Sequence, residues 1–147
     1  MSFGCPTTVA LMKNPRRANT AKSDRRRVLD PDEISAFTHV GDELLERVTL
    51  IRTNLLPPAA DGMTLGKFVL LRGDQISKKT STLLAHELVH VRQFAENGPI
   101  RFLSLYVGSY LKNLFRLRSH RQAYLNIPFE IEARAEAAAW KRDSSGD

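Results

Sequence analysis

The chain has 147 residues, of which 42% are hydrophobic and 26% are charged. These shares are close to the averages for soluble globular proteins, so they argue against a chain that is disordered throughout. The length suits one domain with its own core rather than two. Cys5 is the single cysteine, which excludes an intrachain disulfide and a multi-cysteine zinc site. Any bound metal therefore needs nitrogen and oxygen ligands.

The formal net charge is +6, which predicts contact with an acidic partner or an anionic surface, with nucleic acid as the weaker alternative. No apolar run reaches the roughly 18 to 20 residues of a transmembrane segment, because Arg101, Lys112 and Arg116 interrupt the best candidate. The N-terminal sequence lacks the basic, apolar and small-residue order of a secretory signal. We therefore expect a cytoplasmic protein, or one exported by a route that needs no signal.

Composition divides the chain into three segments. Residues 1–29 are rich in Pro, Thr, Asn, Lys and Arg and contain three consecutive arginines at 25–27. This composition predicts a basic, unstructured arm, with nucleic-acid binding as the alternative. Residues 30–141 form the predicted folded domain, and residues 142–147 form a frayed tail.

The first half of the domain predicts short elements. The sequence DPDE at 30–33 combines a side-chain cap, a first-turn proline and a capping-box glutamate, which begin a helix that runs to about Val40. A short helical turn follows at 42–47. Residues 48–52 and 67–72 are rich in Val, Leu and Ile, and predict two strands separated by a loop that contains proline and glycine.

Three longer helices are predicted in the second half. The first contains the motif described below and ends at the Asn-Gly-Pro sequence of 97–99. The second covers 100–118, and the third begins near Pro128 and ends at about Lys141. One face of the second helix is expected to lie in the core. Its members are Leu103, Tyr106, Val107, Tyr110, Leu111 and Leu114.

The region between Pro99 and Pro128 contains no acidic residue. Its positive charges are Arg101, Lys112, Arg116, Arg118 and Arg121. They predict a solvated face or, as the alternative, a surface for anionic lipid or for an acidic partner.

The sequence His86-Glu87-Leu88-Val89-His90 has the H-E-x-x-H pattern of zinc metalloproteases. Four residues on a helix turn through about 400°, so both imidazoles project from one face and can share one Zn2+ ion. Glu87 lies on the flank of that face, where it can act as a general base. The alternative is that hydrogen bonds in the core satisfy all three polar groups.

A catalytic zinc usually takes a third protein ligand. His120 and a glutamate of the last helix are the candidates, because no histidine follows the motif at short spacing. Glu130 and Glu132 lie about 200° apart around the last helix, so they cannot bind one ion from that helix. Glu136 is the reserve ligand. Otherwise, Glu132 and Glu136 are expected to pair with basic residues of the same helix.

The segments HELVHVRQ and PFEIEARAEA together resemble the gluzincin class of metallopeptidases, in which a downstream helix supplies a glutamate ligand through a Glu-x-x-Ala pattern. Glu130 and Ala133 match this pattern. The resemblance therefore implies Glu130 as the third ligand, 40 residues after His90. Many gluzincins carry Asp or Asn after the alanine to orient a histidine ligand, whereas this chain has Arg134. A neighbouring glutamate of the last helix, Glu132 or Glu136, is then expected to orient it.

The HELVHVRQ ending is also similar to compact gluzincin-like domains associated with bacterial extracellular contractile injection systems. This similarity covers roughly residues 30–137. It implies a minimal zincin-like α+β domain, mainly helical, with a small β-sheet beside the H-E-x-x-H helix. In this class of fold an edge strand binds an extended peptide beside the zinc, and residues 67–72 are the expected strand.

These features predict a zinc metallopeptidase whose metal ligands are His86, His90 and Glu130 and whose substrate is a peptide or a protein. Glu87 is the predicted general base. The alternative function is a non-catalytic zinc-binding scaffold, or a cargo-associated domain of a secretion or injection apparatus. In the peptidase, Tyr124 is the catalytic candidate for stabilising the oxyanion, with His120 as the weaker choice.

Overall fold

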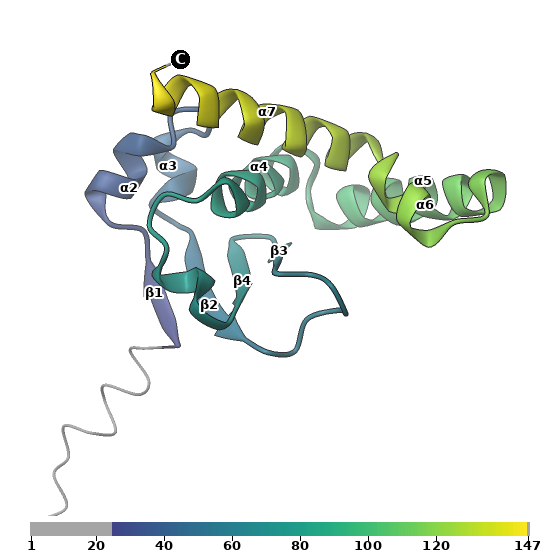
Figure 1. The fold of residues 1–147 in the computed structure, drawn as a ribbon, viewed down its shortest axis with the longest axis horizontal. Coiled ribbons are helices and arrows are strands. Elements are labelled where there is room, and N and C mark those ends of the chain that lie inside the picture. The colour runs from purple at the N-terminus through teal and green to yellow at the C-terminus, as the bar shows by residue number, and fades with distance from the viewer. Residues whose placement is uncertain (1–24, 147) are drawn as a thin grey trace, which may run out of the picture.

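The computed structural model describes residues 25–146, so residues 1–24 of the predicted basic arm lie outside the described part of the chain. The expected α+β architecture is confirmed: most described residues are helical, and a small sheet lies beside the motif helix (Figure 1). The elements in chain order are β1 (Arg26–Val28), α2 (Pro31–Ala36), α3 (Asp42–Leu45), β2 (Thr49–Thr53), β3 (Gly62–Leu65), β4 (Phe68–Arg72), the 3-10 helix η1 (Gly73–Ser77), α4 (Thr82–Asn97), α5 (Pro99–Leu117), α6 (His120–Leu125) and α7 (Pro128–Ser145).

The sheet has the strand order β1-β2-β4-β3. Strand β4 pairs with β2 in parallel and with β3 antiparallel, so Val69 lies opposite both Leu50 and Thr64. The expectation that the strand at 67–72 forms the edge is therefore wrong, because β4 is interior and β3 is the edge strand. The sequence did not predict β3, since its four residues, Gly-Met-Thr-Leu, form a very short segment that directly follows the proline and glycine loop.

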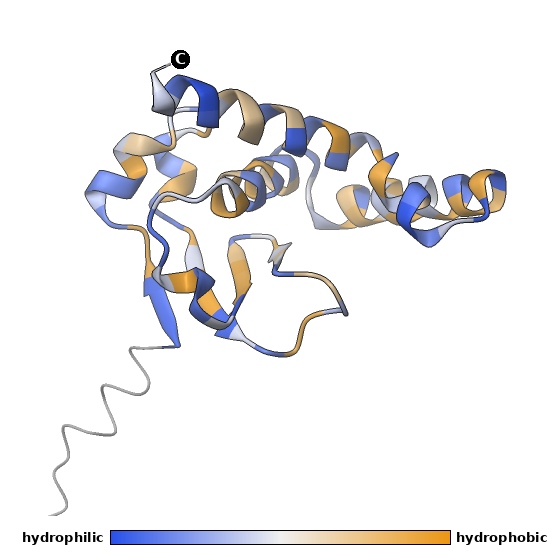
Figure 2. Ribbon diagram, viewed as in Figure 1, coloured by the Kyte–Doolittle hydropathy of each residue, from blue (hydrophilic) through white to orange (hydrophobic). Residues whose placement is uncertain are grey.

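Helix α4 lies between the sheet and α7 (Figure 1). It begins where the Ser81 hydroxyl accepts a hydrogen bond from the Leu84 N–H at 3.1 Å, and it ends at Gly98, whose φ of +74° favours glycine. It contacts β3 and β4, and Leu84, Leu88, Leu50 and Val69 are buried in one core cluster. Apolar segments run along α4 and β4 in Figure 2, and also along α5, which extends away from the sheet. This packing places α4 beside β3.

The N-terminal and C-terminal parts of the described chain meet on the far side of α4. Trp140 of α7 donates its Nε1 hydrogen to the Ala36 carbonyl at 2.7 Å and packs on Phe37, with the ring centroids 5.0 Å apart. Phe37 is fully buried and leaves the helical conformation, so α2 ends before the expected residue, Val40. Helix α7 also continues past the expected end at Lys141. These contacts hold α7 against the body of the domain.

Strand β1 lies within residues 1–29, the segment for which the sequence predicted an unstructured arm. Its Arg27 makes a two-point ion pair with the buried carboxylate of Glu33, at 2.6 and 2.7 Å. The Arg27 side chain also donates to the Ile76 carbonyl. A basic residue that the composition assigned to the arm therefore belongs to the folded domain.

Helix α5 covers only part of the face that the sequence predicted, because Tyr106, Tyr110 and Leu114 are partly buried. Leu103, Val107 and Leu111 are exposed, whereas Phe102 and Asn113 are buried. The reason is that α5 packs mainly on the short helix α6 and contacts α4 only in part. The side of α5 that faces these helices is therefore buried, and it differs in part from the predicted side. Among the helices of residues 25–146, none has the length and apolar character needed to cross a bilayer.

Candidate metal centre

The two motif histidines project from one side of α4 toward α7. Their Nε2 atoms are 3.2 Å apart, and their rings are nearly perpendicular, at 85°. His90 is buried and His86 is partly buried. This is the geometry that the four-residue spacing predicts for two imidazoles sharing one ion.

Glu130, in the first turn of α7, completes the group. Its Oε1 lies 3.2 Å from Nε2 of His90, and its Oε2 lies 3.3 Å from Nε2 of His86. Its side chain is almost fully buried, which is costly for a carboxylate without a counter-charge. His86, His90 and Glu130 thus form a cluster that can hold a metal ion.

The dimensions of this cluster allow its three side chains to share one cation, because one ligand atom from each lies within 4.8 Å of the others. Zinc-to-ligand bonds of about 2.0 to 2.1 Å place neighbouring ligand atoms of a tetrahedron about 3.3 Å apart. The two Nε2 atoms are 3.2 Å apart, and each carboxylate oxygen of Glu130 lies 3.2 or 3.3 Å from one of them. In addition, Oε2 of Glu130 is buried without a hydrogen-bond partner. A cation at the centre of the three groups would satisfy that oxygen.

Electrostatics within the cluster favour positive charge. Burial by itself raises the pKa of Glu130, but the imidazoles of His86 and His90 outweigh it and hold that pKa far below its ordinary value. Burial likewise lowers the pKa of His90, but Glu130 outweighs it and raises that pKa above 6.5. Each group therefore stabilises the charge of the other, and a metal cation can replace the proton between them.

Gln93 fixes the tautomer of His90. Its Nε2 donates to the Phe129 carbonyl and to Oε2 of Glu132, both at 3.1 Å, and neither of these acceptors can donate. Oε1 of Gln93 must therefore be the atom 2.7 Å from Nδ1 of His90, so Nδ1 carries the proton that it accepts. This arrangement leaves Nε2 of His90 directed at the cluster, as a metal ligand requires.

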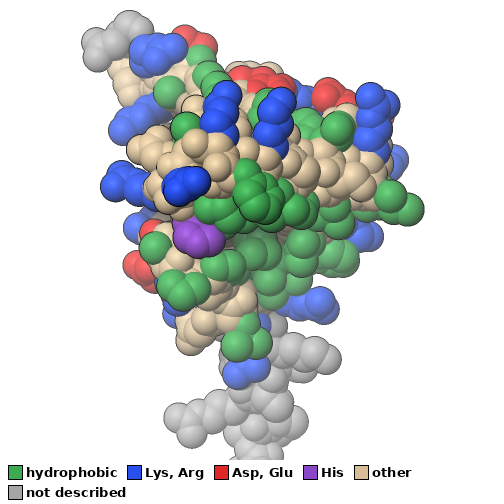
Figure 3. All heavy atoms as spheres, turned by 90° about the vertical axis from the view of Figure 1, so that its right-hand side faces the viewer, with side chains coloured by type: hydrophobic (Ala, Val, Ile, Leu, Met, Phe, Trp, Pro, Cys, Tyr) green, Lys and Arg blue, Asp and Glu red, His purple; other side chains and the backbone are tan. Residues whose placement is uncertain are grey.

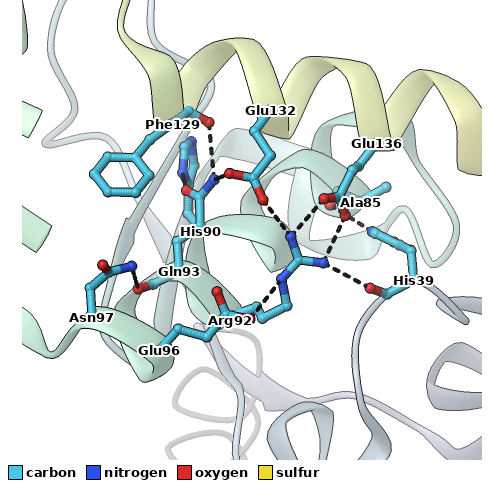
Figure 4. Close-up of polar contacts among 10 residues, drawn as sticks. All are labelled: His39, Ala85, His90, Arg92, Gln93, Glu96, Asn97, Phe129, Glu132 and Glu136. Carbon is cyan, nitrogen blue, oxygen red and sulfur yellow. Dashed lines mark hydrogen bonds and ion pairs between the residues drawn. The ribbon is translucent and has the colours of Figure 1, made fainter.

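A charged network supports Gln93 from outside (Figure 4). Arg92 donates to both carboxylate oxygens of Glu136, at 2.8 and 2.6 Å, and to Oε1 of Glu132 at 2.8 Å. It also reaches the His39 carbonyl at 3.2 Å. Glu132 and Glu136 therefore pair with Arg92 of α4 rather than with basic residues of their own helix, and they join α7 to α4.

Glu87 is held on the opposite flank, against strand β3. The Thr64 hydroxyl lies 2.8 Å from Oε2 of Glu87 and 3.0 Å from its backbone carbonyl. Burial raises the pKa of Glu87 above its ordinary value. Gly62 leaves room for the carboxylate, because a Cβ atom at this position would lie 2.7 Å from Oε1. A buried carboxyl with a raised pKa, next to a metal cluster, suits an exchange of protons.

Residues 54–98 match the family model of the eCIS core domain. This segment contains β3, β4, η1 and α4, and therefore Thr64, Glu87, Gln93 and both histidines of the cluster. The match covers less than half of the chain and does not include Glu130. Neither the curated proteins nor the solved structures give a match. Over these residues the chain is therefore similar to the eCIS core domain.

Two tyrosines outside the eCIS core segment approach Glu130. The Tyr106 hydroxyl, from α5, donates to Oε1 of Glu130 at 2.7 Å. Burial, followed by the charge of Glu130, raises the pKa of Tyr106 and that of Tyr124 on α6, so both phenols remain protonated donors. Tyr124 is 41% exposed and is therefore the one with access to a molecule outside the protein.

The other sequence candidates lie outside the cluster. His120 begins α6 and faces Tyr110, whose hydroxyl is 2.6 Å from Nδ1. Arg134 donates to the Leu125 carbonyl, and its guanidinium lies 3.9 Å from Oε2 of Glu130. The sequence predicted no role for Thr64, predicted Tyr106 only as a core residue, and indicated Gln93 only as part of the HELVHVRQ ending. A polar side chain one turn after His90 was the available signal for Gln93.

Proposed function

We propose that this protein is a zinc-dependent peptidase. The observation that carries the proposal is the combination of a three-ligand cluster with a buried carboxyl, Glu87, on the residue next to one ligand. A zinc ion at this site supplies the Lewis-acid chemistry that activates water for attack on a carbonyl. Two imidazoles and one carboxylate are a ligand set that catalytic zinc sites use.

Glu87 is the proposed general base. The pKa of its carboxyl is raised toward neutral pH. A carboxylate of this kind can accept a proton from water and deliver it to the leaving amine. Thr64 and the space at Gly62 hold the carboxylate in place, so it loses little freedom when a substrate binds. Tyr124 is the proposed donor to the oxyanion, because its hydroxyl stays protonated and is partly exposed.

Strand β3 is the proposed binding site for an extended peptide. It is the edge strand beside α4, so its outer backbone groups are not paired within the sheet. A peptide that adds to this edge passes close to Glu87, because Thr64 of β3 contacts that side chain. Backbone pairing of this kind selects peptides over other amide substrates.

The decisive experiment compares the wild-type chain with Glu87→Gln. The variant keeps the shape of the side chain but lacks a basic carboxylate. We expect one zinc per chain in both proteins, measured by elemental analysis, and at least a 100-fold slower cleavage of a fluorogenic peptide library by the variant. Glu96→Gln is the matched control, because Glu96 is an exposed glutamate of the same helix. Equal cleavage rates for wild type and Glu87→Gln would refute the proposal.

The match to the eCIS core domain favours a second candidate function, a zinc-binding scaffold or cargo-associated domain of an injection apparatus. In that case the cluster maintains a structure that a partner recognises. Loss of the biological function in His86→Ala, together with its retention in Glu87→Gln, would favour the scaffold over the peptidase.

A further inference from the structure

Helix α5 has three distinct sides. One side faces the body of the protein and includes Phe102, Tyr106 and Asn113, which are buried or partly buried. A second side, here called the apolar stripe, is exposed and consists of Ile100, Leu103, Val107, Leu111 and Phe115. A third side, the basic edge, is also exposed and consists of Arg101, Lys112 and Arg116.

The apolar stripe follows the helical repeat. At about 100° per residue its members fall within about 120° around the axis, and the basic edge begins about 40° beyond Phe115. At 1.5 Å per residue the stripe is about 22 Å long. Ile100 and Phe115, at its two ends, are 83% and 82% exposed. Single exposed apolar residues are ordinary on a protein surface, whereas a continuous stripe of this length marks an interaction site.

Charge on the segment that contains α5 and α6 has one sign. No acidic residue occurs between Pro99 and Pro128, and the exposed residues Arg118 and Arg121 add to the basic edge. Figure 3 looks at the molecule from the α5–α6 end and shows a broad field of hydrophobic side chains with Lys and Arg side chains beside it. The surface therefore combines apolar contact with attraction for negative charge.

We propose that α5 binds the surface of an anionic lipid bilayer. The apolar stripe enters the boundary between headgroups and acyl chains, and the basic edge contacts the anionic headgroups. This occupant meets both requirements of the surface. A second copy of the chain would bring like charges together, and residues 1–24 of the same chain contain only one acidic residue, Asp24. The inference does not depend on peptidase activity.

The test measures cosedimentation of the full-length protein with vesicles of phosphatidylcholine alone or with 30% phosphatidylglycerol. We expect binding to the anionic vesicles, weaker binding in high salt, and the same binding with a chelator present. At about 1 kcal/mol for each basic residue, the triple variant Arg101→Gln/Lys112→Gln/Arg116→Gln should bind roughly 100-fold more weakly. The double variant Ile100→Ser/Phe115→Ser should also bind more weakly, because it removes the exposed ends of the stripe.

The matched control is Arg47→Gln/Lys141→Gln/Arg142→Gln, which removes three exposed positive charges elsewhere and should bind as wild type does. Circular dichroism verifies that each variant is folded. An equal loss in this control would overturn the proposal, because binding would then follow total charge. Two further results would also overturn it. In the first, the protein does not bind vesicles but forms a dimer, and Ile100→Ser/Phe115→Ser abolishes the dimer. In the second, the protein binds polyglutamate as strongly as it binds the vesicles, and Ile100→Ser/Phe115→Ser does not change the binding to polyglutamate.

Discussion

The side chain of Gln93 determines which nitrogen of His90 faces Glu130. Oε1 of Gln93 accepts the Nδ1 proton of His90 at 2.7 Å, which leaves Nε2 at 3.2 Å from the carboxylate. The orientation of the amide is set in turn by the Phe129 carbonyl and by Glu132. Three residues that do not belong to the cluster thus prepare one of its ligands.

The variant Gln93→Leu should bind zinc about 10- to 100-fold more weakly than wild type, because His90 loses the acceptor that fixes its tautomer. Competition with a chromophoric chelator measures this affinity. Glu96→Gln is the control, since Glu96 is exposed and contacts only Arg92 of this region. Unchanged affinity in Gln93→Leu would show that the hydrogen bond does not prepare the site.

Zinc should stabilise the wild-type chain against thermal unfolding and should fail to do so in Glu130→Gln, which loses the charged ligand. Differential scanning fluorimetry at a series of zinc concentrations measures the shift in Tm. In Glu96→Gln we expect the stabilisation to remain, because Glu96 is exposed and lies outside the cluster. The same zinc-dependent shift in both variants would contradict the assignment of Glu130 as a ligand.

The variant Gly62→Ala should displace the carboxylate of Glu87, because the added Cβ would lie 2.7 Å from Oε1. We expect a loss of about 1 to 3 kcal/mol in the free energy of unfolding, as for other overpacked sites, with zinc affinity retained. Urea denaturation measures the loss. Gly41→Ala provides the comparison, since a Cβ there has nothing within 4 Å. If the two variants were equally stable, the space beside Glu87 would not be essential.

The contribution of Glu136 to stability should depend on pH. Its hydrogen bond with Arg92 lowers the pKa of Glu136 below 4.5, so the stabilisation is complete above pH 4.5 and is lost as the pH falls through the lower, folded-state pKa. We expect Glu136→Gln to unfold more easily by about 0.5 to 1 kcal/mol at pH 7, because the pair is partly exposed. This difference should shrink below pH 4.5.

Denaturation of the metal-free proteins, followed by the fluorescence of Trp140, measures this pH dependence. Trp140 is the single tryptophan and is buried against Phe37, so its emission reports on the docking of α7. A difference between wild type and Glu136→Gln that stays constant down to pH 3 would contradict the expected linkage.

Regular spacing explains which parts of the candidate site could be predicted from the sequence. His86 and His90 are one helical turn apart, so their shared direction follows from the helix alone. Glu130 required a resemblance to known sequences, because 40 residues separate it from His90. Thr64 and Tyr106 contact the site from β3 and α5, and no local pattern connects these residues with α4.

The same reasoning explains why the prediction of the buried face of α5 is only partly right. The helix has apolar residues at helical spacing on its outer side and aromatic residues on its inner side, so periodicity alone does not identify the covered face. The choice depends on α6, where the Ala123 carbonyl accepts a hydrogen bond from the buried amide of Asn113. A polar residue that finds its partner in another helix is a long-range feature, which sequence periodicity does not contain.

The position of Glu130 in α7 also sets an order of events during synthesis. The ribosome releases the H-E-x-x-H helix first, and Glu130 follows 40 residues after His90. A metal ion held by all three ligands is therefore captured only after α7 has emerged and docked on α4. Complete coordination of such an ion would then be a late step in the maturation of the nascent chain.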